Sequence, residues 1–160
     1  MVARFAALAF VAGATVAAAQ APSVDKRLTP ADVEGVVGFP VKQIAPGSQP
    51  GAGPGLNFVG PDGKLVLMVN FGTADMYIRA KTQKEIDIGG QKVPMPLFHA
   101  LVPGIGDEAF DSPPGPSQYV LYVRKMLFAT SLTTYPGAGG KPALAMDDLK
   151  ALGRIVVSRM

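Results

Sequence analysis

Glycine and proline concentrate in three segments of this chain, near residues 43–55, 111–118 and 136–142, and these segments divide it into short pieces. Proline lacks a backbone N–H and glycine adds conformational freedom, so neither residue supports a regular ladder or helix interior. We therefore expect each segment to be a surface loop. The pieces between the loops suit hairpins and short helices, and tight hairpins produce a largely antiparallel sheet.

The clearest hairpin lies between residues 56 and 71. Stretches 56–59 and 64–71 flank a Gly-Pro-Asp-Gly turn at 60–63, in which proline presets the first turn dihedral. Apolar residues on both faces of 64–71 indicate an interior strand. Further strands are predicted at 39–44, 98–102, 109–110, 119–123 and 126–134, and a small hairpin at 85–93.

Two helices are predicted with well-defined ends. Thr29 is a suitable N-cap, Pro30 fits the first helical position, Asp32 stands at N3, and Gly38 is a suitable stop. A longer helix is predicted over 146–158, where acidic residues favour the N-terminus. Its apolar stripe consists of Leu149, Leu152, Val156 and Met160.

Residues 73–84 fit two structures. A helix capped by Thr73 would turn Met76, Tyr77 and Ala80 inward, and this is the preferred interpretation. An alternation of apolar residues in the same stretch fits a strand nearly as well. Together the elements predict an α+β fold of two layers, a mainly antiparallel sheet with the short N-terminal helix and the longer C-terminal helix packed on one face.

Residues 1–19 have the pattern of a secretory signal peptide. Arg4 supplies the positive charge, 5–16 are apolar, and three alanines place small residues before a cleavage site at Gln20. The apolar run is shorter than the roughly 20 residues of a spanning helix. The alternative is an uncleaved N-terminal anchor.

Cleavage at this site predicts a periplasmic or extracellular protein with no remaining membrane span. We expect a disordered lead-in at 20–27 and a single domain at 28–160. The sequence does not predict its oligomeric state.

Composition excludes several functional classes. The chain has no cysteine, which removes disulfides, thiol nucleophiles and cysteine-based metal sites. Its net charge is +3 and its basic residues are scattered, whereas a nucleic-acid binder usually has a dense basic patch with aromatic residues. We therefore expect no nucleic-acid partner and no cofactor.

Near residue 100 the sequence has one histidine and three acidic residues that could act in catalysis or metal binding. His99 is the only histidine, and catalysis would require the fold to bring a nucleophile or carboxylate to it. Asp107, Glu108 and Asp111 offer oxygen ligands, but they lack the spacing of an EF-hand. We expect a turn instead, in which Gly106 permits unusual dihedrals and Asp107 accepts hydrogen bonds from neighbouring backbone N–H groups. No catalytic, cofactor-binding or metal-ligating residue is predicted.

Four segments occur in a characteristic order: 28–33 (Leu-Thr-Pro-Ala-Asp-Val), 38–40 (Gly-Phe-Pro), 104–110 (Gly-Ile-Gly-Asp-Glu-Ala-Phe) and 119–125 (Tyr-Val-Leu-Tyr-Val-Arg-Lys). With the closing helix, this order resembles a family of short actinobacterial secreted domains and lipoproteins of unknown function. The chain departs from that pattern because it lacks the lipobox cysteine and any cysteine at 56–58. The resemblance implies a non-enzymatic envelope domain and no catalytic residues.

The leading functional hypothesis is therefore an exported domain that binds a small apolar ligand or an envelope protein without turnover. Its three Gly/Pro loops would be the recognition surface if they gather at one edge. Aromatic residues are expected mostly in the core, with an apolar pocket as the alternative. Two other hypotheses stay open: a hydrolase assembled around His99 and acidic residues, and an accessory or inhibitor protein that exposes an apolar patch.

Overall fold

The computed structural model describes residues 24–51, 53, 55–137 and 140–160. The predicted signal peptide at 1–19 and the first half of the predicted lead-in, 20–23, lie outside these residues. No helix of the described part is long and apolar enough to cross a membrane.

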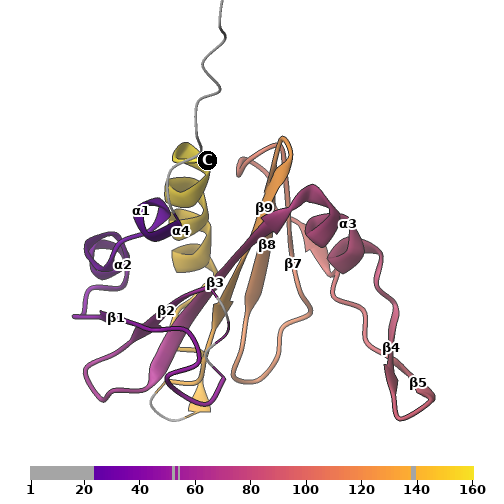
Figure 1. Ribbon diagram of the computed structural model, residues 1–160, viewed down its shortest axis with the longest axis horizontal. Coiled ribbons are helices and arrows are strands. Elements are labelled where there is room, and N and C mark those ends of the chain that lie inside the picture. Colours follow the sequence, from indigo (N-terminus) through magenta and orange to yellow (C-terminus); the bar gives the residue numbers. More distant parts are fainter. Residues whose placement is uncertain (1–23, 52, 54, 138–139) are drawn as a thin grey trace, which may run out of the picture.

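Among the described residues, seven strands form one antiparallel sheet (Figure 1). Its strands are β1 (Lys42–Ile44), β2 (Leu56–Val59), β3 (Leu65–Thr73), β6 (Ala100–Leu101), β7 (Glu108–Asp111), β8 (Val120–Lys125) and β9 (Phe128–Thr134). The strand order is β1-β2-β3-β9-β8-β7-β6, and every neighbouring pair is antiparallel. The predicted hairpins and the antiparallel sheet are confirmed.

The main core lies between this sheet and two helices, α2 (Pro30–Val37) and α4 (Met146–Ser158). Every second residue of the central strands points to these helices, so Leu67, Leu121 and Leu132 are fully buried. The apolar stripe predicted for α4 faces them. Both helices therefore pack on one face, as expected.

A third helix, α3 (Ala74–Thr82), lies on the opposite face of the sheet (Figure 1). The alternate residues of β7 and β8, Phe110 and Tyr122, form a second apolar cluster with Tyr77 and Ala80 of α3. The preferred helix is therefore confirmed over 74–82, although Thr73 at its N-cap position makes no side-chain hydrogen bond, and the two-layer prediction is corrected. The physical reason is the junction: α3 begins directly after β3, and its first N–H, on Ala74, donates to the carbonyl of Leu127.

The last four residues of the predicted lead-in form a single helical turn, α1 (Val24–Arg27). The Arg27 guanidinium is buried over the rings of Phe71 and Phe128, 5.1 and 5.7 Å from their centroids. This cation–π contact depends on residues distant in the chain, so local composition could not reveal it.

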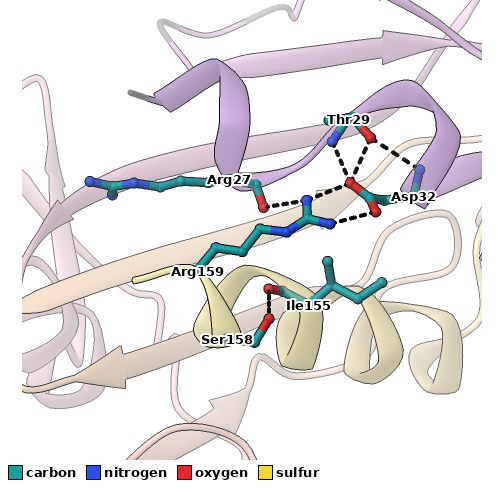
Figure 2. Close-up of polar contacts among 6 residues, drawn as sticks. All are labelled: Arg27, Thr29, Asp32, Ile155, Ser158 and Arg159. Atoms are coloured by element: carbon teal, nitrogen blue, oxygen red, sulfur yellow. Dashed lines mark hydrogen bonds and ion pairs between the residues drawn. The ribbon is translucent and has the colours of Figure 1, made fainter. Parts of the chain in front are cut away.

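The start of α2 is held by the predicted N-cap Thr29, which forms a capping box with Asp32, and by one further contact (Figure 2). The Thr29 backbone N–H donates to the Asp32 carboxylate at 2.8 Å, and the Asp32 N–H donates to the Thr29 hydroxyl at 3.3 Å. Arg159, just after α4, donates to both Asp32 carboxylate oxygens at 2.6 and 2.8 Å. These hydrogen bonds from Arg159 hold the pKa of Asp32 well below its ordinary value.

A separate two-stranded ribbon, β4 (Glu85–Ile88) with β5 (Gln91–Pro94), projects from the body after α3 (Figure 1). Its register pairs Ile86 with Val93 on one face and Asp87 with Lys92 on the other. The hairpin predicted at 85–93 is thus confirmed, but it is not part of the main sheet.

Candidate functional site

The three Gly/Pro loops lie at one end of the sheet, the lower end in Figure 1. The Tyr135 hydroxyl donates to the Gly51 carbonyl at 2.9 Å, which joins the first loop to the start of the third. The middle loop enters β8 at the same end, because Val120 pairs with Thr133.

A small groove of 500 Å³ opens at this end, between the turn that joins β2 to β3 and the described part of the third loop. Lys64, Lys141 and several prolines line it, with Phe39 and Val66 as its larger apolar side chains.

The acidic residues near position 107 contact different partners. One Asp107 carboxylate oxygen accepts a hydrogen bond at 2.6 Å from the backbone N–H of Met126, which lies in the β8–β9 turn. Glu108 forms ion pairs with Lys81 and, at 3.8 Å, with Arg124. The expected turn is present, since Gly106 has a φ of +62°. The expected donor is corrected, because the N–H from which the Asp107 carboxylate accepts belongs to the distant Met126 and not to a neighbouring residue. In the described part of the chain, no three His, Asp or Glu residues are placed to hold a metal ion.

The third acidic residue, Asp111, does meet His99. The imidazole Nδ1 lies 3.1 Å from one Asp111 carboxylate oxygen, and the Ala100 N–H donates to the same oxygen at 2.9 Å. The pair lies beside the edge strand β6, and 51% of the His99 side chain is exposed. Neither residue lines the small groove or the larger one beside α3, so this arrangement orients the imidazole toward water rather than into a cleft.

The larger groove, with a volume of 810 Å³, runs between α3 and the exposed part of the sheet. Its floor comes from β3, β9 and β8, and its walls from α3 and Leu97. Apolar contact surface is supplied by Met76 and Tyr122, and burial raises the pKa of the Tyr122 phenol, which keeps it neutral. The aromatic rings mainly pack behind this wall: Phe110 stacks on Tyr122 with centroids 4.7 Å apart.

Asn70 gives the groove floor an unmet hydrogen-bonding capacity. Its side-chain oxygen is buried and has no hydrogen-bond partner among the described residues. Leaving a buried acceptor unpaired costs about 1–3 kcal/mol. Ser131, its cross-strand partner on β9, lines the same floor and is also buried. This oxygen lies beneath the first loop, because a Cβ atom on Gly53 would be 3.4 Å from it.

Sequence reasoning missed both floor residues. A Thr- and Ser-rich strand such as β9 suits a polar face turned to solvent, but Thr130, Ser131, Thr133 and Thr134 are all buried. Asn70 did carry a signal, because asparagine is depleted in strands and stands here in an otherwise apolar run.

The groove beside α3 is therefore the candidate functional site, since it combines volume, apolar walls and an unpaired polar group on the floor. Comparisons of the whole chain with protein-family models, with curated proteins and with solved structures gave no match.

Proposed function

We propose that this chain is an exported, non-enzymatic binding protein that takes a small, largely apolar ligand in the groove beside α3. The observation that carries the proposal is the 810 Å³ groove between α3 and the sheet, with Met76, Leu97 and Tyr122 as its apolar walls. Such a site is complementary to a small, largely apolar molecule. Pockets for small ligands usually occupy roughly 300–1,000 Å³ and combine apolar walls with few polar groups.

The polar rim supports a ligand with a hydrophilic end. Arg79 and Gln83 extend from α3 to the same groove, and Asp75 lies one turn earlier. An apolar body would contact the walls while its polar end stays near this rim. The resemblance to short actinobacterial envelope domains agrees with binding without turnover.

A hydrolase centred on His99 has less support. The imidazole and its Asp111 partner lie outside the groove, so a ligand bound there would not be in contact with them. General base catalysis needs the base within hydrogen-bond reach of the proton it takes.

The groove is tested with Nile red, an uncharged dye whose fluorescence rises in apolar surroundings. The wild-type protein should bind it, and Leu97→Lys should weaken binding by at least about 10-fold, because it removes apolar wall and introduces a charge. The matched control is Leu101→Lys, which makes the same change on an exposed side chain outside the groove.

Circular dichroism of both variants must first show an unchanged fold. If wild-type protein does not bind the dye, or if the two variants weaken binding equally, the groove is not the ligand site.

Export is tested by the mature N-terminus. Expressed with its complete sequence in a bacterial host, the protein should be recovered from the periplasm or medium and begin at Gln20, because the three preceding alanines suit signal peptidase. N-terminal sequencing gives the answer. A protein that begins at Met1 and stays in the cytosol would contradict the export part of the proposal and leave the groove untouched.

A further inference from the structure

The tip of the β8–β9 hairpin exposes two large apolar side chains. Lys125 pairs with Phe128, so the turn consists of Met126 and Leu127 alone. Their exposed fractions are 71% and 76%, and the neighbouring Phe128 is also exposed. Tight hairpin turns normally carry Asn, Asp or Gly, which makes this composition unusual.

The backbone conformation of the tip also makes methionine energetically unfavourable there. Met126 has a φ of +54° and is the one non-glycine residue with positive φ in the described part of the chain. A side chain in this left-handed region raises the energy of the turn, whereas Asn or Gly adopts it readily. Folding therefore gains nothing from methionine and leucine here.

The turn is held firmly with these side chains outward. The Met126 N–H donates to the Asp107 carboxylate, and the Leu127 carbonyl accepts from the Ala74 N–H at 2.9 Å. The tip thus presents a preformed apolar point at the upper end of the sheet in Figure 1, opposite the Gly/Pro loops.

The N-terminal part of the chain joins the domain at this same end. Arg27 of α1 stacks over Phe128, next to the tip. The apolar stretch 5–16 precedes α1, and the seven residues 17–23 between them can span at most roughly 25 Å.

We propose that the β8–β9 tip docks this end of the domain on a lipid bilayer, with Met126 and Leu127 inserted among the acyl chains near the headgroups. A protein partner suits the tip less well, because a stable interface buries roughly 800 Å² on each side and the tip offers only three apolar side chains. A bilayer accepts a small apolar point without matching its shape, and the exposed Lys26 of α1 suits the headgroup region.

Docking would also bring the larger groove toward the membrane. Val24, Phe71 and Thr73 line that groove, and Thr73 pairs with Phe128 beside the tip. The docking proposal stands on the tip alone and does not require the groove to bind a ligand.

The chain has no tryptophan, so a single introduced tryptophan reports on its own surroundings. Leu127→Trp in the chain that begins at Gln20 is expected to shift its emission to the blue when phosphatidylcholine vesicles are added, and to be quenched by brominated lipid. Ile88→Trp is the matched control, because Ile88 is 58% exposed and the β4–β5 ribbon that carries it lies far from the tip in Figure 1. Both variants lack residues 1–19, so the apolar stretch 5–16 cannot attach either of them to the vesicles.

A double variant separates docking from folding. Met126→Gly with Leu127→Asn suits a two-residue turn in which only the first residue has positive φ, so the unfolding midpoint should stay the same or rise. Vesicle partitioning of the tip, measured by co-sedimentation, should fall by about 100-fold or more, because two apolar side chains no longer enter the bilayer.

The proposal is overturned if the Leu127→Trp emission does not respond to vesicles, if Ile88→Trp is quenched equally, or if the double variant partitions like wild type. It is also overturned if sedimentation velocity shows that the tip mediates self-association, with the wild type dimeric and the double variant monomeric.

Discussion

Replacing Gly106 with alanine is expected to lower the free energy of unfolding by at least about 3 kcal/mol. A Cβ atom at this position would lie 2.4 Å from the Arg124 carbonyl oxygen and 3.0 Å from a Val123 methyl carbon. The backbone oxygen cannot move without breaking its bond from the Asp107 N–H, which fastens the turn to β8. The positive φ of +62° adds a separate cost for any side chain.

Gly104→Ala is the matched control for this prediction. Gly104 lies two residues earlier in the same turn and has a φ of +76°, but a Cβ atom there would meet no other atom within 4 Å. Gly104→Ala should therefore lower the free energy of unfolding by only about 1 kcal/mol, which is the cost of a side chain at positive φ without any steric clash. Urea unfolding followed by circular dichroism measures both. Equal losses for the two variants would show that close packing at Gly106 is not what matters.

The second large effect is expected at Asp32. Its replacement by alanine removes the capping box of α2 and the paired hydrogen bonds from Arg159, which join the beginning of the domain to its end. Loss of the cap costs about 1 kcal/mol. The Arg159 side chain is 36% exposed, so solvent weakens the ion pair and we count about 1 kcal/mol for it. The total expected loss is about 2 kcal/mol at neutral pH.

The same contact predicts a dependence on pH. The pKa of Asp32 is lowered in the folded protein, chiefly by the hydrogen bonds from Arg159, and its ordinary value is 3.8. Its stabilising contribution is therefore complete well above pH 3.8 and declines as the pH falls below that value. The difference in unfolding free energy between wild type and Asp32→Ala should be constant near neutrality and shrink on acidification.

Asp147→Ala is the control for the acid behaviour. Lys150 lowers the pKa of Asp147 through a hydrogen bond, but the Asp147 side chain is almost fully in water. Its removal should change stability little at any pH. A difference between wild type and Asp32→Ala that does not change on acidification would contradict the role given to the Asp32–Arg159 pair.

Local sequence was sufficient to predict the strands and most helix ends. The N-cap at Thr29, the turn glycines and the apolar stripe of α4 are determined by neighbouring residues, and the structure has them as predicted. The repeat of apolar residues along a strand or helix predicts which side of that element is apolar. It does not predict which other element will cover that side.

Long-range packing decided the rest. The position of α3 on the second face of the sheet created the larger groove, and its floor residues Asn70 and Ser131 became neighbours through strand pairing. The contacts of Arg27 with Phe71 and of Arg159 with Asp32 join segments that are distant in the sequence.

The sequence by itself determined which pieces of this chain become strands and helices, because hydrogen bonding, capping and turn geometry act over a few residues. Tertiary structure alone decided where the groove lies, which polar group it leaves unpaired and which apolar side chains stay exposed at the β8–β9 tip. Those features arise from contacts between segments far apart in the chain, and no local pattern encodes them.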